Sequence, residues 1–147
     1  DIPAEAMSIT ELTREAASQG VILSMENSGQ PIRSMALLVQ EARNQLSSEE
    51  GSYLGLCPDA TNQLRGFPES DPLAELDAVP LDMLKIVHFK QARDGKAYPT
   101  VDTGDLDCLK MLHLLEAKNY QGAAIMEIPP APEVLENLSA SFAYLRS

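Results

Sequence analysis

Cysteine and long apolar runs are scarce in this sequence. Its 147 residues contain only two cysteines, Cys57 and Cys108, and no Cys-x-x-Cys pair. A disulfide framework is therefore not expected, and reduced thiols in a cytoplasmic protein are the simpler interpretation. No stretch approaches the roughly 20 consecutive apolar residues that a membrane span requires. We therefore expect no membrane partner.

Positive charge is scarce as well. The chain has 11 lysines and arginines against 22 aspartates and glutamates, which gives a net charge of −11 at neutral pH. Proteins that bind nucleic acid neutralise its phosphates with lysine and arginine, so this balance argues against a nucleic-acid partner. The hydrophobic content of 44% is enough for one core. The composition indicates one folded domain.

Glycine-rich nucleotide-binding motifs are also missing, since no Gly-x-Gly-x-x-Gly and no Walker-type loop follows an apolar run. What the sequence does contain is an alternation of helical and strand-like segments. Ser8 is expected to cap the first helix and Gly20 to end it. The predicted helices cover residues 9–19, 31–48, 71–79, 105–119 and 132–147. The strand-like runs lie within residues 21–27, 53–62, 83–90 and 122–130.

This alternation favours an α/β fold with parallel strands joined by right-handed crossovers. Two architectures of this kind bind ligands at the carboxyl ends of their strands, the open doubly wound sheet and the (β/α)8 TIM barrel. Because nucleotide-binding loops are missing, the barrel is the prediction. The least regular part is segment 90–105, which is long enough to be a functional loop.

Each strand-like run ends on or near a residue that suits metal binding or acid–base chemistry. Successive members of this set are 33, 29 and 39 residues apart, which leaves room for one helix, one strand and their loops. Apolar residues 123–126 fit a strand that is covered on both faces, and an ionised glutamate directly after it is costly to desolvate. Either that glutamate lies in water or it belongs to a site that requires its charge. The four residues are Glu26, Asp59, His88 and Glu127.

Five short motifs carry a family resemblance when they are taken in order. They are ILSMEN (22–27), LCPDATN (56–62), KIVHFKQAR (85–93), TGDLD (103–107) and NYQGAAIMEIP (119–129). Together they resemble the second half of a sugar phosphate isomerase/epimerase of the xylose isomerase-like TIM-barrel superfamily. The resemblance implies that residues 1–147 are the C-terminal half of a single TIM-barrel domain and supply about its last four βα units. A complete barrel needs about 250 residues, so the N-terminal half is expected in a longer form of this chain, in a separate chain, or in a second copy.

The resemblance also implies a site and its chemistry. Glu26 and Glu127 would transfer protons while a metal ion holds the carbonyl of a sugar or polyol substrate and stabilises an enediolate. The ligand types leave Mn²⁺, Mg²⁺, Co²⁺ and Zn²⁺ open. The implied ligands of one divalent metal ion are Glu26, Asp59, His88 and Glu127. The candidate substrate contacts are Asn62, Lys90 and Arg93.

The sequence departs from the family's pattern at three positions. Some members have histidine at the position of Asn62, many have aspartate at that of Gln91, and the pattern has glycine at that of Asp102. These changes leave the metal set intact but bear on the substrate. We therefore expect a metal-dependent isomerase or epimerase of carbohydrate metabolism. Two alternatives remain: a lyase such as an inosose or dehydroshikimate dehydratase, and a non-catalytic barrel fragment.

Overall fold

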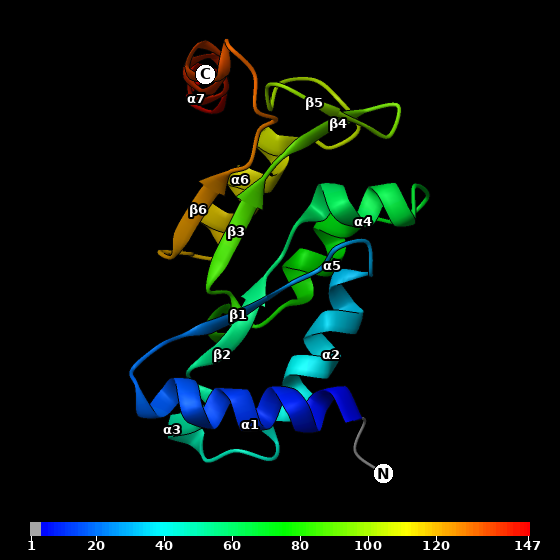
Figure 1. Ribbon diagram of the computed structural model, residues 1–147. Helices are drawn as coiled ribbons and strands as arrows, with labels where there is room; N and C mark the ends of the chain where they lie inside the picture. The colour runs from blue at the N-terminus through cyan, green and yellow to red at the C-terminus, as the bar shows by residue number, and fades with distance from the viewer. Residues whose placement is uncertain (1–3) are drawn as a thin grey trace.

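Four parallel strands in two pairs form the centre of the computed structural model, which describes residues 4–147 (Figure 1). Strand β1 pairs in parallel with β2, and β3 pairs in parallel with β6. Bridges from Leu56 to Leu84 and from Asp59 to His88 join the two pairs, so the strand order is β1-β2-β3-β6. This is the arrangement of half a (β/α)8 barrel. The strands are β1 (Leu23–Glu26), β2 (Leu54–Cys57), β3 (Ile86–Phe89) and β6 (Ala123–Met126).

Helices connect the strands and bury one face of the sheet. Alternate strand residues such as Leu54, Leu56, Val87 and Phe89 are almost fully buried in the resulting core. The longer helices are α1 (Ala4–Ser18), α2 (Ile32–Arg43), α6 (Cys108–Ala117) and α7 (Val134–Leu145). The shorter ones are α3 (Ser48–Gly51), α4 (Ala60–Gly66), α5 (Pro72–Ala78) and the 3-10 turn η1 (Leu81–Met83). No helix in residues 4–147 combines the length and apolar character that crossing a membrane requires.

The first predicted helix is correct in place but wrong at its start. Helix α1 already includes Ala4, so Ser8 lies inside the helix and does not cap it. The hydroxyls of Thr10 and Thr13 donate instead to the carbonyl oxygens of Ala6 and Ile9 within the same helix, which satisfies these buried side chains. The predicted end is confirmed, because Gly20 follows the helix with a positive φ of 68°.

The second predicted helix is split in two. Helix α2 buries the predicted apolar stripe but ends at Arg43, five residues before the expected end. A new helix, α3, then begins after Ser47, whose hydroxyl accepts a hydrogen bond from the Glu50 N–H while the Glu50 carboxylate accepts from the Ser47 N–H. This capping box competes with continuation of α2. Sequence periodicity also missed the short helix α4.

Segment 90–105 is more regular than expected. It contains an antiparallel hairpin of β4 (Gln91–Arg93) and β5 (Lys96–Tyr98). The turn residues Asp94 and Gly95 both have positive φ, 50° and 71°, which matches the right-handed twist of paired strands. The Asp-Gly pair is a strong hairpin signal, but the polar strands around it hid the pattern. Only the part after β5 is irregular.

Strand β6 is not covered on both faces, contrary to expectation. Ala123, Ala124 and Ile125 are exposed, with 44% of Ile125 accessible to solvent. The reason is its position in the sheet, because within residues 4–147 β6 pairs with β3 only, just as β1 pairs with β2 only. The outer edges of β1 and β6 therefore carry backbone groups that no other described strand satisfies. The apolar sequence therefore correctly indicated a strand, but it did not indicate that this strand lies at an edge with one side exposed.

Candidate metal centre

The pleat of the strands directs the predicted ligands to one face of the sheet. Glu26 is the ladder partner of Cys57, so both side chains point to the same side. Asp59 lies two residues beyond Cys57, and the period of two brings it to that side as well. On the neighbouring pair, Glu127 lies two residues beyond the ladder partner of His88. All four side chains thus leave the carboxyl ends of adjacent strands toward the face that the helices do not cover.

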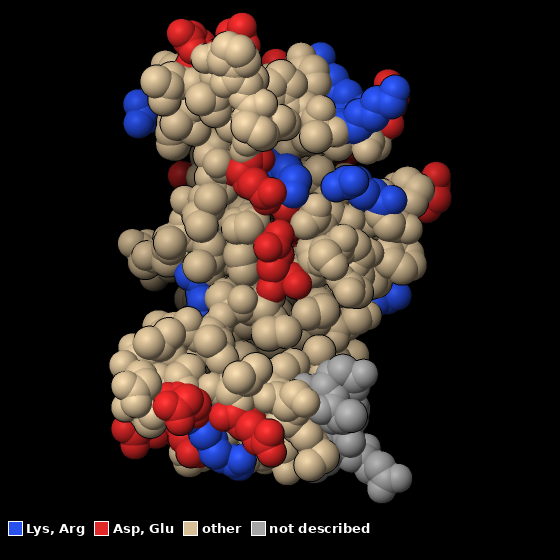
Figure 2. Space-filling view, viewed as in Figure 1, with Lys and Arg blue, Asp and Glu red and all other residues tan. Residues whose placement is uncertain are grey.

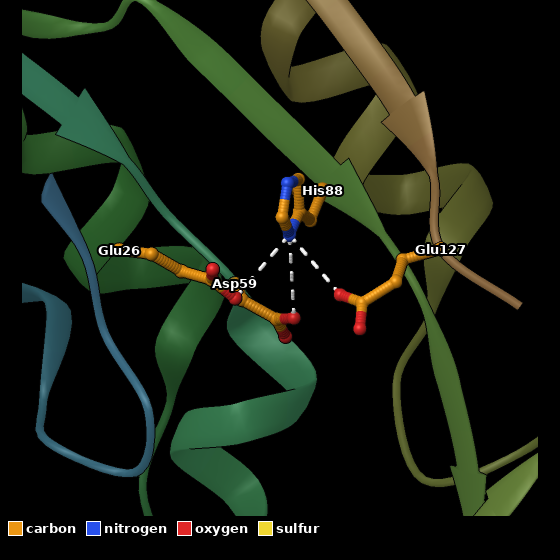
Figure 3. Close-up of side chains that lie close together, drawn as sticks. All are labelled: Glu26, Asp59, His88 and Glu127. Atoms are coloured by element: carbon orange, nitrogen blue, oxygen red, sulfur yellow. Dashed lines mark ion pairs between the residues drawn. The ribbon is translucent and has the colours of Figure 1, made fainter. Parts of the chain in front are cut away.

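The three carboxylates converge on the His88 imidazole (Figure 3). Its Nδ1 lies 3.3 Å from Glu26 Oε1, 3.2 Å from Glu127 Oε2 and 3.8 Å from Asp59 Oδ2. One ligand atom from each residue lies within 4.8 Å of the others. Residues up to 101 positions apart in the sequence, Glu26 and Glu127, therefore form one cluster.

Three atoms of this cluster are buried and have no hydrogen-bond partner among the residues that the structure describes: Asp59 Oδ2, His88 Nδ1 and Glu127 Oε2. Of these, Asp59 Oδ2 lies 3.4 Å from the Lys90 ammonium, close enough for an ion pair but outside hydrogen-bond geometry. A buried polar atom left without a partner costs about 1–3 kcal/mol, and more when it is charged. A cation between these atoms would satisfy all of them. Carboxylate oxygens with one imidazole nitrogen are donors that Mn²⁺, Mg²⁺, Co²⁺ and Zn²⁺ accept. The donor set therefore fits a divalent metal ion.

Asp59 divides its carboxylate between two tasks. Its Oδ1 accepts a hydrogen bond of 2.7 Å from the Asn62 N–H and so caps the N-terminus of α4. Its Oδ2 faces the cluster. The residue is 0% exposed, and this burial raises the pKa of the Asp59 carboxyl, although the Asn62 N–H and the Lys90 charge oppose the effect. The helix cap fixes the direction of the second oxygen.

Asn27 holds the backbone of Asp59 in place, a role that sequence inspection missed. Its side-chain Nδ2 donates to the Asp59 carbonyl oxygen and its Oδ1 accepts from the Asp59 N–H, both at 2.9 Å. The side chain is nearly fully buried. A signal was available, because Asn27 directly follows Glu26 and must point to the buried side of the sheet. A polar side chain there requires partners.

Lys90 forms an ion pair inside the cluster. Its Nζ lies 3.0 Å from Glu127 Oε1 and 3.4 Å from Asp59 Oδ2. Burial by itself would raise the pKa of Glu127, but the hydrogen bond and charge of Lys90, with a contribution from His88, lower it. Burial by itself would lower the pKa of Lys90, but Glu127 and Asp59 raise it. Glu127 and Lys90 are therefore both charged at neutral pH.

The other two candidate substrate contacts lie in different places. Asn62 borders the cluster: its Nδ2 donates to Glu26 Oε1 at 3.2 Å, and its Oδ1 accepts from Lys90 Nζ at 3.2 Å. Arg93 belongs to the hairpin, where its Nε donates to the Thr103 carbonyl oxygen at 2.7 Å and its guanidinium stacks on Tyr98. Asn62 and Lys90 thus lie beside the predicted ligands, whereas Arg93 contacts Thr103 and Tyr98 in and after the hairpin.

Gln91, the first residue of β4, connects the start of the hairpin to the segment that follows it. Its Nε2 donates to the carbonyl oxygens of Asp102 and Leu106, and its Oε1 accepts from the Leu106 N–H. Gly104 packs so closely on Gln91 that a Cβ at this position would collide with the amide. Gln91, where many members of the family have aspartate, therefore stabilises the local structure through its side-chain amide. It orders the segment that leads into α6.

Cys57 faces the cluster but does not have the properties of a nucleophile. Burial, followed by the negative charges of Glu26, Asp59 and Glu127, raises the pKa of the Cys57 thiol to about 12. The thiol is thus protonated at neutral pH, whereas the thiolate is the reactive form. Figure 2 agrees with this electrostatic picture, because acidic side chains gather in the middle of the face drawn there, with basic groups directly beside them.

The chain belongs to the xylose isomerase-like TIM barrel family, whose family model matches residues 4–147. Among curated proteins, none matches this sequence significantly. A xylose isomerase domain protein from Planctomyces limnophilus superimposes with a TM-score of 0.74 at 18% identity, over 96% of this chain and 51% of that one. The apo form of 3-keto-D-glucoside 4-epimerase, YcjR, from E. coli gives a TM-score of 0.69 at 20% identity, with the same coverage of 96% and 51%.

The chain therefore spans about half the length of these two solved structures. At such low identities the likeness establishes the fold and leaves the chemistry to the residues of the site. The predicted fold is confirmed: the chain is an α/β half of a TIM barrel.

Proposed function

We propose that this chain carries the metal ligands and the proton-transfer groups of an isomerase or epimerase that acts on a sugar or polyol. The observation that supports this most directly is the set of buried atoms Asp59 Oδ2, His88 Nδ1 and Glu127 Oε2, which face one another without hydrogen-bond partners among residues 4–147. Family membership and the likeness to the E. coli epimerase support the choice of substrate class.

Glu26, Asp59, His88 and Glu127 would hold one divalent ion, Mn²⁺, Mg²⁺, Co²⁺ or Zn²⁺. When bound, such an ion acts as a Lewis acid that polarises a substrate carbonyl and makes the neighbouring C–H more acidic. Asp59 is fully buried and capped to α4, so its role is to hold the ion and not to exchange protons. His88 presents Nδ1 to the carboxylates and has the same role.

Glu26 and Glu127 are the proposed acid and base. Glu26 ends β1 and Glu127 directly follows β6, and the two approach His88 from opposite sides (Figure 3). Both are more accessible than Asp59, with side-chain exposures of 41% and 44%. One glutamate on each side of a substrate carbon can remove a proton from one face and return it on the other, which is what epimerisation requires.

The remaining expectations for the site and domain are part of the same proposal. Lys90 and Asn62 border the cluster and would contact substrate hydroxyls, whereas Arg93 would first have to release Thr103. Residues 1–147 would be the C-terminal half of one barrel domain, with the other half, in the same or another chain, closing the substrate pocket. The two free, buried cysteines fit a cytoplasmic protein.

The decisive experiment is a calorimetric titration of Mn²⁺ into the wild-type chain and into Glu127→Gln, with Glu116→Gln on the exposed side of α6 as the matched control. We expect Glu127→Gln to bind Mn²⁺ at least tenfold more weakly, because one charged ligand is lost, and to lower kcat by about 10²–10⁴-fold in the assembled enzyme. The control should behave like wild type. Equal Mn²⁺ affinity in all three proteins would exclude Glu127 as a ligand.

The assay should follow solvent deuterium entering a panel of keto sugars and polyols. Deuterium uptake without a new ultraviolet chromophore supports isomerisation or epimerisation. A new chromophore would identify elimination and favour the dehydratase alternative.

A further inference from the structure

Lys90 is the one lysine or arginine that forms ion pairs with the candidate ligands among the residues that the structure describes. It lies two residues beyond His88, so the strand pleat directs it to the same face. Its ammonium contacts Glu127 Oε1, Asp59 Oδ2 and the side-chain oxygen of Asn62 at 3.0, 3.4 and 3.2 Å. Only 16% of the Lys90 side chain is exposed.

The ammonium flanks the cluster without filling its centre. Glu127 directs Oε1 to Lys90 and Oε2 to His88, so its two oxygens have separate partners. Glu127 Oε2 and His88 Nδ1 remain without hydrogen bonds from any residue in 4–147. A metal ion and the ammonium can therefore be present together, on opposite sides of the same carboxylate.

The formal charges of the three carboxylates and Lys90 can be added to give the net charge that a metal ion would meet. Glu26, Asp59 and Glu127 carry three formal negative charges and Lys90 carries one formal positive charge, which leaves a net charge of −2 on these four side chains. One divalent cation neutralises this remainder. We propose that Lys90 is the permanent counter-ion of the metal centre: it matches the cluster to a divalent cation and holds the carboxylates together before the cation binds.

This inference rests on the proposed metal site and adds two consequences to it. Without metal, loss of Lys90 would leave three carboxylates close together with no fixed positive charge, and the chain should be less stable. With metal, loss of Lys90 would remove the repulsion between the ammonium and the cation, and binding should become tighter. A residue that served only to support the local fold would weaken metal binding when removed.

The test compares Lys90→Met, which keeps the length of the side chain and removes its charge, with Lys96→Met in β5, where the lysine is exposed. Mn²⁺ affinity is measured by calorimetry, and Tm is measured with a chelator present. We expect Lys90→Met to bind Mn²⁺ roughly tenfold more tightly or better, since two charges about 4 Å apart interact appreciably even at the dielectric constant of water. Its metal-free Tm should fall. Lys96→Met should change neither quantity.

A double variant, Lys90→Met with Glu127→Gln, checks the origin of the loss in stability. It removes one charge of each sign, so its metal-free Tm should return at least halfway to the wild-type value. Weaker or unchanged Mn²⁺ binding in Lys90→Met, or a double variant less stable than Lys90→Met, would overturn the counter-ion role while leaving the metal site intact. A wild-type chain that binds no Mn²⁺ would overturn the metal site and this inference together.

Discussion

Asp59 combines more tasks than any other residue of the candidate site. One carboxylate oxygen caps α4, the other faces His88, and Asn27 holds its backbone N–H and C=O. Each contact uses a different atom of Asp59, so none interferes with the others. The result is a buried carboxylate whose direction is fixed before any ligand binds. Such preparation of a site lowers the entropy cost of binding.

Without a metal ion, the buried charge of Asp59 lowers the stability of the folded chain. This leads to a prediction about Asp59→Asn. Asparagine caps helices as well as aspartate does, so the variant loses the buried charge but keeps α4. In the presence of a chelator at neutral pH, we expect it to be more stable than wild type by about 1 kcal/mol, or about 2–4 °C in Tm for a domain of this size. It should lose Mn²⁺ binding.

The effect should depend on pH in one direction. Burial raises the pKa of Asp59 in the folded state, so folding favours its protonated form. The stability that this form contributes is fully present below the unfolded-state pKa of about 3.9 and is lost as the pH rises through the folded-state pKa. The difference in Tm between Asp59→Asn and wild type should therefore be small in acid and grow toward neutral pH. Asp71, an exposed aspartate that caps α5, is the matched control, and Asp71→Asn should show no such growth.

At the scale of elements, the hairpin β4–β5 comes directly after strand β3, which carries His88. Gln91 belongs both to the start of this hairpin and to the hydrogen bonds that order residues 102–106. The conformation of the hairpin turn is therefore coupled to the segment that leads into α6. The turn depends on Gly95, which adopts a φ of 71°.

We expect Gly95→Ala to destabilise the hairpin by about 1–2 kcal/mol, the cost of a left-handed conformation for a residue with a Cβ. No atom lies within 4 Å of the position where that Cβ would be, so the effect comes from the backbone alone. Hydrogen exchange of residues 91–98 should become roughly tenfold faster, because about 1.4 kcal/mol corresponds to a factor of ten. Gly51→Ala, in α3, should leave these rates unchanged, and equal rates in both variants would contradict the argument.

At the scale of the whole molecule, the half barrel leaves two sheet edges and one sheet face without a partner in residues 4–147. Ile125, 44% exposed, lies on that face in the outer strand β6. Exposed strand edges with apolar residues promote association between chains, and natural proteins often protect such edges with lysine. The uncovered face is also the one on which the candidate ligands lie. Association and site formation therefore concern the same surface.

We therefore expect the 147-residue chain by itself to associate as its concentration rises, and Ile125→Lys to reduce this association. The control is Leu135→Lys, on α7, which replaces a side chain that is 73% exposed but is not part of a sheet edge. Sedimentation velocity over a wide concentration range measures the effect. If both lysine variants reduce association equally, general surface hydrophobicity and not the edge of β6 is the cause.

Local patterns in the sequence were sufficient to predict a parallel α/β barrel and the order of the four candidate ligands, and the family resemblance added that the chain is half of such a barrel. Strand-like runs, helix starts such as Asp71 and Asp107, and the residues that end each run depend on neighbours a few positions away. The pleat then determines which side chains share a face once a strand is recognised. For this reason Glu26, Asp59, His88 and Glu127 could be predicted as a set.

Contacts between distant strands decided the rest. Whether Lys90 reaches Glu127, or Asn27 reaches Asp59, depends on the register of strands that are more than 30 residues apart, and no local pattern contains that register. The exposure of β6 is a further case, because an apolar strand has the same sequence whether or not another strand covers it. The sequence by itself determined which groups end each strand. Only the tertiary structure decided their distances, charges and partners, since these arise where separate strands meet.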